Sequence, residues 1–502
     1  MVKFPQKTGD VLWLTAILII FGLLFFWVLS TPEIGRYPLD DAYIVDHSVA
    51  SIATGHENRF PGSAPWLGIT SPVFTGLLLL LSSVVTIPVG HAVLTILSAM
   101  LFIAGMYVYG RQNSVHPLFV SLFLATVVFS GKVFYQLLNG IETSLAMASI
   151  VWSFFFFEFA AEKRVGYVLI GTLYFIRPEL GVLSAIFAAQ LFVTKPRAWL
   201  RKLTLIFSTM FLLALVQYMV SGQLLPNTMN AKVYFFAEGC RSAAFKSGFV
   251  LDAIFRFLNG TGLVSAGFAL LIFARSRAAI AIFASVFVCV FYLRFPGALY
   301  HNSFRYLSVF IPFCWMGWMA GLANASYLIR WFSVALALIA TLLTLPDMLQ
   351  TISAYQEKTA SRFEENHSVV DWVRTHLPPD AIVLIHDAGL ISTVGTQPLI
   401  DLVGLKSPSS TIINKRILYK ECRRDPAAIS DIALQGNASY LVVNRNWDRI
   451  FKLTSALKAE GWTVRRADVE RRKSYYEVFH ITPPVKSTPS PVVSFHHAQP
   501  VR

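Results

Sequence analysis

The chain has 502 residues, of which 55% are hydrophobic and 14% charged, and its mean hydropathy is +0.57. A soluble globular protein carries about 25% charged residues, so this composition excludes an ordinary soluble protein and indicates a chain that lies mostly in a bilayer. The net charge of +14 does not indicate nucleic-acid binding, because much of it stands in short basic clusters between apolar runs, as at Lys163 and Arg164. That distribution is the positive-inside pattern of membrane proteins.

Apolar runs long enough to cross a hydrocarbon core recur from residue 11 to residue 349. The first run follows two lysines and has no small-residue cleavage site after it, so we expect a retained anchor rather than a cleaved signal peptide. We therefore predict an α-helical polytopic membrane protein with about 11–13 transmembrane helices. The expected spans are 11–30, 73–88, 91–109, 116–130, 141–159, 203–221, 251–273, 278–294, 305–322 and 328–349, with a broken pair at 166–176 and 179–193.

The basic clusters predict a topology with one internal conflict. Placing the clusters in the cytoplasm puts residues 31–72, residues 131–140 and everything after residue 350 outside. An even number of crossings must then separate the first two of these segments, yet three apolar runs lie between them. Either the run at 73–88 is re-entrant or one of the placements is wrong.

After Leu349 the sequence becomes more polar and alternates helix-like with strand-like segments. HSVVDWVRTHL is typical of an amphipathic helix, AIVLIHDAG of a buried strand, and SDIALQGNASYLVVN of a further helix followed by a strand. We therefore divide the chain into a transmembrane domain at 1–350, with its first outer loop at 31–72, and a small extracytoplasmic α/β domain at 351–482. The Pro- and Ser-rich segment 483–502 is predicted to be a disordered tail.

The four cysteines give no metal-binding pattern, because no CxxC spacing is present. Cys289 and Cys314 lie in apolar runs and are expected to pack as small hydrophobic residues. Cys240 and Cys422 both fall on the outer side. A disulfide between them is one alternative, but two separate thiols are the interpretation that we favour.

Two adjacent carboxylates, Asp40 and Asp41, stand in the polar segment 37–71 that follows the first apolar run. Neighbouring carboxylates repel, so the pKa of one is raised unless a cation lies near. Such a pair suits a general base, a ligand for substrate hydroxyls or a ligand for a hard divalent cation. The alternative is a solvated loop beside the membrane.

Three further charged residues interrupt the apolar segments of the first half. Glu142 begins an apolar span, where it would bind substrate or stabilise the helix N-terminus through the helix dipole. Arg177 and Glu179 flank a proline in FIRPELG, where a broken helix at membrane depth requires surrounding protein or water. A self-paired Arg–Glu cap is the alternative for this pair.

Two outward-facing segments of the second half add cations and polar groups. LLPNTMNAK carries Asn227, a candidate for sugar hydroxyls, and Lys232, a candidate for a phosphate or an ordinary interfacial lysine. YHNSFRYLSVFIP carries His301, Arg305 and Tyr306, and arginine binds phosphate in a bidentate manner. The alternative for this segment is an interfacial belt of tyrosine and arginine.

Together these residues place carboxylates opposite cations at one membrane surface. A site that joins a polar acceptor to a lipid phosphate leaving group needs this combination, because the attacking hydroxyl requires a base and the departing phosphate requires positive charge. A lipid-linked donor would also explain why the site lies at the face of the bilayer.

With these motifs, the chain resembles the membrane-embedded GT-C-type glycosyltransferases, and in particular the arabinofuranosyltransferase-like group. The resemblance covers nearly the whole chain, in the family's order, and rests on DDAYI, GITSPVF, NGIETS, IRPELG, PNTMNAK, HNSFRYLSVFIP and IHDAGLISTVGTQPLIDLVGL. Ile141 and Leu180 stand where relatives often have Met and Gly, which leaves the reaction class unchanged and the sugar and acceptor open.

The resemblance implies an inverting enzyme that takes a sugar from a polyprenyl phosphate at the outer face of a bacterial inner membrane. Its acceptor would be a glycan, lipid or protein, with no role for nucleic acid. Asp40 would be the base, and Asp41 would orient the acceptor or hold a cation. The donor phosphate would be bound by Arg177, Lys232, Arg305 and His301, and the substrate by Glu142, Glu179, Asn227 and Tyr306.

Two other functions remain open from the sequence. A transporter or flippase of lipid-linked sugars predicts inverted repeats and charged residues near the bilayer midplane, and the sequence shows neither. A polytopic scaffold whose outer domain binds glycans would leave the Asp pair without a role. Asp387 and Asp401 follow predicted strands, where capping of turns is favoured over contact with carbohydrate.

Overall fold

The computed structural model describes residues 8–31, 33–194, 199–224, 226–274, 276–422, 425–467 and 476–484. The predicted tail at 483–502 lies almost entirely outside these residues. The helices of the membrane part are α1 (Thr8–Ser30), α2 (Asp40–Thr54), α3 (Pro72–Ser82), α4 (Ile87–Gln112), α5 (Pro117–Phe129), α6 (Gly131–Leu138), α7 (Thr143–Phe159), α8 (Arg164–Ile176), α9 (Gly181–Thr194), α10 (Trp199–Ser221), α11 (Asn227–Phe236), α12 (Ala243–Thr261), α13 (Leu263–Ala269), α14 (Ser276–Tyr292), α15 (His301–Phe304), α16 (Ile311–Asn324) and α17 (Tyr327–His376). Short 3-10 turns are η1 (Pro178–Leu180), η2 (Leu270–Ala274), η3 (Pro296–Tyr300) and η4 (Leu307–Phe310).

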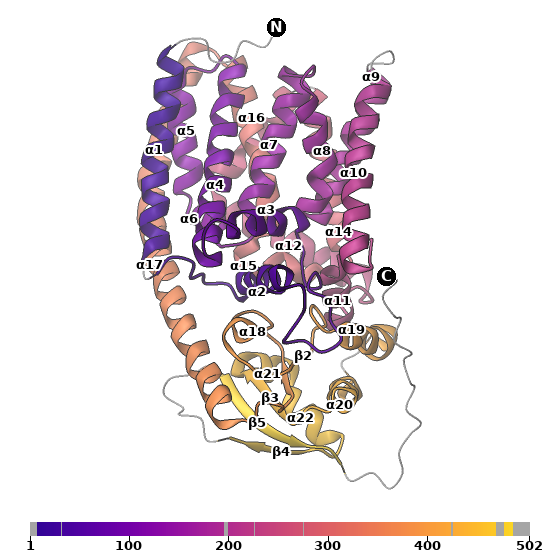
Figure 1. The fold of residues 1–502 in the computed structure, drawn as a ribbon. Coiled ribbons are helices and arrows are strands. Elements are labelled where there is room, and N and C mark those ends of the chain that lie inside the picture. Colours follow the sequence, from indigo (N-terminus) through magenta and orange to yellow (C-terminus); the bar gives the residue numbers. More distant parts are fainter. Residues whose placement is uncertain are drawn as a thin grey trace.

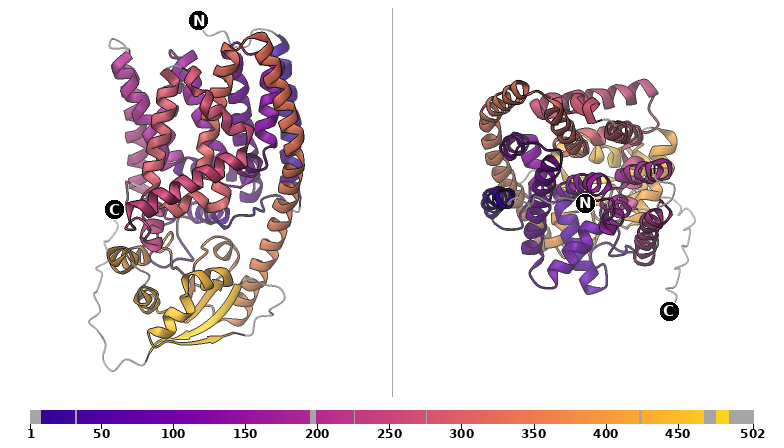
Figure 2. Two further views of the ribbon diagram at one scale, coloured as in Figure 1. Left: turned by 180° about the vertical axis from the view of Figure 1, so that it is seen from behind. Right: turned by 90° about the horizontal axis from the view of Figure 1, so that it is seen from above.

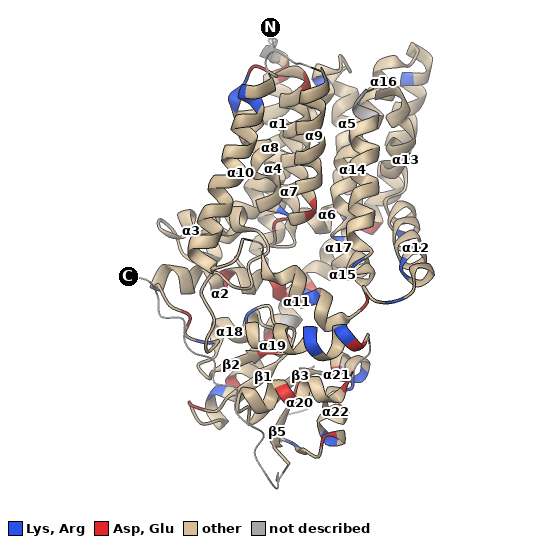
Figure 3. Ribbon diagram, turned by 90° about the vertical axis from the view of Figure 1, so that its right-hand side faces the viewer, with Lys and Arg blue, Asp and Glu red and all other residues tan. Residues whose placement is uncertain are grey.

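Apolar helices form a bundle that stands above a smaller α/β part (Figure 1). Figure 2 shows the same division from behind, with α17 running along one side of the molecule from the bundle to the α/β part. Large apolar side chains such as Leu23, Phe211 and Leu343 are exposed on the outside of α1, α10 and α17. Figure 3 shows few charged residues along these helices and many at their ends and in the α/β part. The chain is a multi-pass membrane protein.

Five helices among the described residues are long and apolar enough to cross a membrane, or up to seven if each of two bent pairs counts as one span. The long helices are α1, α4, α10, α17 and the segment Leu307–Asn324. Shorter apolar helices, among them α7, α8 and the segment Pro178–Val193, stand beside them. The expected total of 11–13 depends on whether these shorter helices cross as well.

The helix α3 resolves the conflict in the predicted topology. It begins at Pro72, where the Ser71 side chain accepts the N–H of Phe74, and it ends after only 11 residues. It lies across the lower end of the bundle rather than along it (Figure 1). The prediction of a span at 73–88 was therefore wrong, and two crossings, α4 and α5, separate the first outer loop from α6.

The expected span at 251–273 was also wrong. Gly262 adopts a left-handed φ of +53° between α12 and α13, and only the segment Leu263–Ala274 remains as an apolar helix. Glycine adopts this backbone conformation without the steric penalty that a side chain brings. As a result, α12 stays at the end of the bundle that faces the α/β part (Figure 3).

The outer α/β part contains a mixed five-stranded sheet in the order β2-β1-β3-β5-β4. The strands β2, β1 and β3 are parallel, and β5 is antiparallel to both β3 and β4. The strand predicted in AIVLIHDAG is β1, and the helix and strand predicted in SDIALQGNASYLVVN are α20 and β3. The elements are β1 (Val383–Ile385), α18 (Leu390–Val394), β2 (Leu399–Asp401), α19 (Pro408–Asn414), the π-helical turn η5 (Lys415–Tyr419), α20 (Pro426–Gln435), β3 (Tyr440–Asn444), α21 (Arg445–Phe451), α22 (Leu453–Ala459), β4 (Thr463–Arg466) and β5 (Tyr476–Thr482).

The helix α17 is continuous from Tyr327 to His376, so a domain boundary at residue 350 falls inside it. It packs on the bundle from Val334 in its first half to Tyr355 just past its middle. Its last turns pack on the sheet through Val369 and Val373. The division into domains at 1–350 and 351–482 stays a prediction.

The first outer loop is held against the outer part by buried polar contacts. The Arg59 guanidinium donates to the carbonyls of Gln397 and Ser392, both at 3.0 Å, and also to that of Gly395. Its own carbonyl accepts the N–H of Leu399 in β2 at 2.6 Å. Arg59 therefore satisfies the backbone carbonyls at and after the end of α18, and it joins the first outer loop to the outer part.

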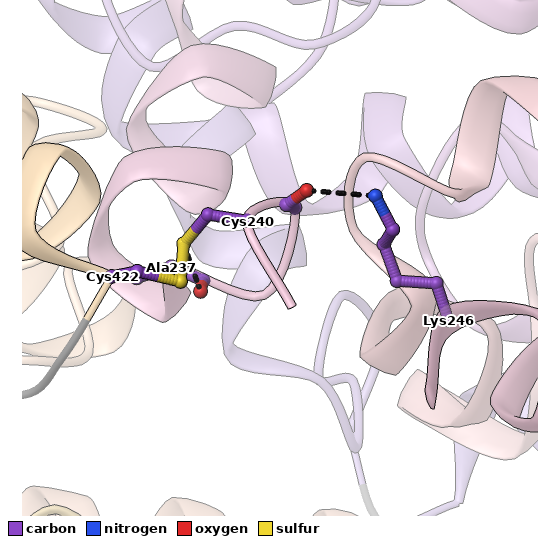
Figure 4. Close-up of a disulfide and its surroundings, with 5 residues drawn as sticks. Ala237, Cys240, Lys246 and Cys422 are labelled. Atoms are coloured by element: carbon purple, nitrogen blue, oxygen red, sulfur yellow. Dashed lines mark hydrogen bonds between the residues drawn. A yellow bond between two sulfur atoms is a disulfide. The ribbon is translucent and has the colours of Figure 1, made fainter. Parts of the chain in front are cut away.

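A disulfide joins Cys240, which follows α11, to Cys422, which follows η5 (Figure 4). The two Cα atoms are 5.7 Å apart, and 182 residues separate the cysteines in sequence. Lys246 donates to the carbonyl of Gly239 at 3.0 Å beside the bond. The expectation of two separate thiols was wrong, because α11 and η5 pack together and bring the cysteines into bonding range.

Candidate active site

A cavity of about 300 Å³ lies between the end of the membrane bundle and the outer sheet. It contains five of the ten predicted site residues, which come from α2, from α11 and from the segment around α15 and η4. The outer part closes the cavity with the segments that follow β1, β2 and β3. The lining residues are Leu39, Asp40, Asp41, Ile44, Lys232, Phe236, Phe295, His301, Asn302, Tyr306, His386, Asp387, Ala388, Val403, Leu405, Asn444, Asn446 and Trp447.

Asp40 is the first residue of α2, and its carboxylate binds the outer part. Its Oδ2 accepts the N–H of Gly389 at 2.7 Å and its Oδ1 accepts that of Leu390 at 3.0 Å. Burial and the nearby Asp387 carboxylate raise the pKa of Asp40 to about 7, although the two N–H donors act in the opposite direction. Each carboxylate oxygen retains a further lone pair, so the group can still accept a proton from a ligand hydroxyl.

Asp41 lies beside Asp40 but faces cations. Its Oδ2 lies 2.6 Å from Arg305 Nη1 and 3.9 Å from Lys232 Nζ. Burial raises the pKa of the Asp41 carboxyl, but Lys232 and Arg305 outweigh this effect and hold the pKa well below its usual range. Asp41 therefore remains an anion that orients the two cations.

Arg305 is buried, and its guanidinium has one clear polar neighbour on each side. Nη1 donates to Asp41, and Nη2 donates to the Tyr306 hydroxyl at 2.6 Å. Its Nε has no hydrogen-bond partner among the described residues. A buried N–H without a partner is costly, and a phosphate oxygen is the kind of acceptor that would satisfy it. Arg305 does not line the 300 Å³ cavity itself, but it lines a smaller one, of about 30 Å³, which it shares with Lys232.

Three of the predicted site residues form an ion cluster beneath Arg305. Arg177 Nη2 lies 2.6 Å from Glu179 Oε1, and Arg177 Nε lies 3.8 Å from Glu142 Oε1. Arg177 also donates to the main-chain carbonyl of Arg305 at 3.3 Å. None of the three lines the 300 Å³ cavity, although Glu142 lines the smaller one. Their geometry favours a supporting position behind Arg305, and their predicted contacts with phosphate and substrate stay predictions.

Asn227 also lies outside the 300 Å³ cavity. Its Nδ2 donates to the Gly404 carbonyl at 3.1 Å and lies 3.5 Å from Thr411 Oγ1. This amide therefore holds α11 against the segment that follows β2, and its predicted contact with sugar hydroxyls stays a prediction.

Both carboxylates of the Asp pair have hydrogen-bond partners within the protein. Among the residues that the structure describes, no group of three or more His, Cys, Asp or Glu side chains is arranged to hold a metal ion. Asp40 accepts backbone N–H groups and Asp41 contacts Arg305, so their surroundings suit hydroxyl and phosphate groups. A divalent cation at this pair stays a prediction.

On the outer-domain side of the cavity, the sequence singled out Asp387 alone, and it favoured capping of a turn over contact with carbohydrate. His386 and Asp387 follow β1, and Asn444, Asn446 and Trp447 lie at the end of β3. The sequence signal available for them was polar residues at the ends of two predicted strands. Asp401 shows the other outcome of that signal, because its carboxylate accepts the N–H groups of Val403 and Lys406 and so caps its own loop.

Comparison with known proteins identifies the fold. Residues 351–481 match a family model described as "Domain of unknown function (DUF8728)", and no curated protein matches the chain in sequence. The structure is similar to ArnT from Cupriavidus metallidurans bound to undecaprenyl phosphate, with a TM-score of 0.55, 12% identity and coverage of 94% of this chain and 98% of that one. For the apo state of that protein the TM-score is 0.56, at 10% identity and the same coverage.

A weaker likeness extends to the arabinofuranosyltransferase AftD from Mycobacteria, with a TM-score of 0.47 and 15% identity over 93% of this chain and 41% of that one. That score carries no argument about the sugar. The likeness to ArnT shows that the chain has a GT-C-type fold, with a helical membrane part and a C-terminal α/β part.

Proposed function

We propose that this GT-C-type membrane protein is an inverting glycosyltransferase that takes a sugar from a polyprenyl-phosphate donor. The observation that carries the proposal is the contrast between two adjacent carboxylates that line the cavity: Asp40 has a pKa of about 7, whereas Asp41 is held as an anion by Lys232 and by Arg305 behind it. Sugar transfer from a phosphate requires a general base with a pKa near neutrality, which takes the acceptor proton, and cations that stabilise the leaving phosphate. The ArnT structure bound to undecaprenyl phosphate supports this donor class.

In the proposed reaction, Asp40 takes the proton of an acceptor hydroxyl as its oxygen attacks the anomeric carbon. The bond between that carbon and the phosphate oxygen breaks, and the bonding electrons leave with the polyprenyl phosphate. Lys232 and Arg305 stabilise the charge that develops on the phosphate, and Asp41 keeps both cations in place. Direct attack from the opposite face inverts the anomeric centre.

His301 and Tyr306 complete the membrane side of the proposed site. Both line the cavity, and the Tyr306 hydroxyl accepts a hydrogen bond from Arg305. Tyr306 therefore fixes the plane of the guanidinium, and His301 adds a polar contact for the phosphate or the sugar. Arg177, with Glu142 and Glu179, holds Arg305 from behind.

The proposed setting is a bacterial inner membrane with the site facing the outside. The basic residues Lys163 and Arg164 stand at the start of α8, whose other end reaches Arg177 and the site, so they lie at the opposite end of the bundle. The disulfide on the site's side suits an oxidising compartment. Arabinofuranose is the sugar that the sequence resemblance favours, and the acceptor would be a glycan, lipid or protein.

The proposal is tested by incubating the purified protein in detergent with polyprenyl-phosphoryl arabinofuranose, mannose or glucose and a mixture of acceptors. Release of polyprenyl phosphate is followed by mass spectrometry. We expect release from one donor in preference to the others. Folded protein that consumes none of the donors, but moves labelled lipid across vesicles, would contradict the proposal and favour a transporter.

A further inference from the structure

The parallel strands of the outer sheet direct three segments into the cavity. In the order β2-β1-β3, the chain leaves β1 toward β2 on one side and returns to β3 on the other. Open α/β sheets bind ligands outside the carboxyl ends of their strands, at the point where the connections change direction. His386 and Asp387 follow β1 and Trp447 follows β3 at that point, and all three line the cavity.

These residues form a polar and aromatic wall. The Trp447 ring centroid lies 4.6 Å from that of His386 and 4.5 Å from that of Phe451, which stacks on the indole and does not line the cavity. Asp387 accepts a hydrogen bond from the Tyr476 hydroxyl and is 25% exposed. Asn446 is exposed beside Trp447. Phe451 and Tyr476 therefore hold Trp447 and Asp387 in place from the side away from the cavity, and the wall presents polar groups to the cavity.

His386 adds an observation that points to a ligand. Its side chain is fully buried, and neither ring nitrogen makes a hydrogen bond within the described part of the chain, although Nε2 lies 3.2 Å from Asp387 Oδ2. Buried polar atoms in native proteins nearly always have partners. A ligand hydroxyl or a water in the cavity is the partner that would satisfy this ring.

The cations at the cavity all belong to the membrane side. Lys232 lines the cavity there, and Arg305 contacts Asp41 behind it, whereas Asp387 is the single charged residue among the cavity-lining residues of the outer part. An acidic and aromatic wall repels phosphate and suits neutral hydroxyls, because a carboxylate and an amide accept and donate hydrogen bonds while an indole packs on the apolar face of a sugar ring.

We infer that this wall is the acceptor subsite and that the acceptor is a neutral carbohydrate. A sugar ring packs against Trp447, Asp387 and Asn446 bind its hydroxyls, and a neighbouring hydroxyl reaches Asp40. This assignment rests on the proposed function. It follows from the position of Asp40, whose carboxylate is bound to Gly389 and Leu390 on the same side of the cavity as the wall.

A peptide acceptor fits this geometry less well. Extended peptides bind proteins commonly by adding a strand to an open sheet edge. The β2 edge is already occupied, because the N–H of Leu399 donates to the Arg59 carbonyl. The other edge is β4, which is separated from β1 by β3 and β5. Neither edge offers a peptide a hydrogen-bonded route to Asp40.

The first arm of the test measures binding without donor. Tryptophan fluorescence of the whole protein in detergent is titrated with an arabinofuranose tetrasaccharide, mannotetraose and maltotetraose, and with a decapeptide rich in Ser and Thr. We expect one oligosaccharide to bind, and Trp447→Phe and Asn446→Ala to weaken that binding about tenfold. Trp372→Phe is the matched control, because Trp372 stacks on His376 in the outer part at 4.8 Å and does not line the cavity. Binding of the peptide alone, or equal binding by all variants, would overturn the inference.

The second arm measures transfer, so that the inference and the proposed function can fail separately. With the preferred donor, Trp447→Phe and Asn446→Ala should raise the KM for the oligosaccharide about tenfold and leave the KM for the donor within about twofold. Donor consumption that requires the peptide or a lipid acceptor would overturn the inference and leave the proposed function standing. Absence of donor consumption would overturn the proposed function, while the binding arm would still decide whether the wall binds carbohydrate.

Discussion

Adjacent residues in the first outer loop acquire opposite properties from their surroundings. Asp40 packs against the outer part and lies near another carboxylate, so its proton is held more tightly, with a pKa of about 7. Asp41 points one position further around α2 toward Lys232 and Arg305, so it stays ionised. Pairs of titratable groups with pKa values pushed apart are characteristic of acid–base chemistry. Without Lys232 and Arg305, Asp41 would lose the charges that keep it ionised, and the two carboxylates would no longer differ in this way.

The raised pKa of Asp40 predicts the pH profile of sugar transfer. The base form is the carboxylate, so kcat/KM should rise with pH, about tenfold per pH unit at low pH, and level off above about 7. The profile is measured between pH 5 and pH 9 with the preferred donor at low concentration. A rate that stays flat below pH 7, or that falls as the pH rises toward 7, would contradict the role of Asp40 as base.

The position of Arg305 predicts a defect in donor binding. Lysine at this position keeps the charge but cannot contact Asp41 and the Tyr306 hydroxyl at once. Arg305→Lys should therefore raise the KM for the donor by about tenfold or more, the equivalent of one or two charge-assisted hydrogen bonds. Arg256→Lys is the control, because Arg256 forms an exposed ion pair with Asp252 on α12. An unchanged KM in Arg305→Lys would show that the guanidinium does not bind the donor.

At the scale of elements, the sequence predicted most helices and the main strands of the outer sheet. It did not predict which apolar runs cross the membrane and which lie at the end of the bundle. Hydropathy identifies a run without telling whether it crosses the bilayer or lies along its surface. The run at 73–88 contains Ser82 and Ser83, where α3 ends, and the run at 251–273 contains Gly262, where the helix breaks. In both places a local helix-ending residue outweighed the apolar composition.

The candidate site was predicted in part, for a physical reason. Charged residues are rare in membrane segments, so Asp41 and Arg305 stood out although 264 positions separate them. Trp447 and Asn446 belong to a polar domain in which such residues are common. Their place beside Asp40 depends on the register of β1 and β3 and on the docking of the outer part, neither of which a single sequence displays.

The contact between α11 and η5 predicts a stability effect. Cys240→Ser removes the disulfide to Cys422, which closes a loop of 182 residues, and should lower the free energy of unfolding by about 2–4 kcal/mol. Thermal unfolding in detergent, with and without reductant, measures the change. Cys289→Ser, at a free cysteine, should respond to reductant as the wild type does, whereas Cys240→Ser should not respond. Titration of four free thiols in the unreduced, unfolded wild type would contradict the bond.

For the whole molecule, catalysis by this account requires both parts. The membrane part supplies Asp40 and the cations, and the outer part supplies the backbone donors to Asp40 and the wall at Trp447. The core of the outer part is shared, since Phe60 of the first loop and Phe235 of α11 pack into it. The outer part is therefore expected to keep its position over the cavity.

The orientation across the membrane can be measured directly. In a Cys289→Ser background, Glu460→Cys lies on the exposed surface of the outer part and Lys163→Cys at the opposite end of the bundle. A membrane-impermeant maleimide added to intact bacterial spheroplasts should label Glu460→Cys alone, and should label Lys163→Cys after permeabilisation. The reverse pattern would place the site in the cytoplasm and contradict the proposed localisation.

The most direct test of the account is donor turnover by wild type and Asp40→Asn, compared at pH 8 with Asp431→Asn, which changes an exposed ion pair in the outer part, as the control. Released polyprenyl phosphate and glycosylated acceptor are both quantified. The account predicts that Asp40→Asn remains folded but loses at least about a hundredfold in rate, while Asp431→Asn transfers sugar like the wild type. Undiminished transfer by folded Asp40→Asn would contradict the assignment of Asp40 as the base.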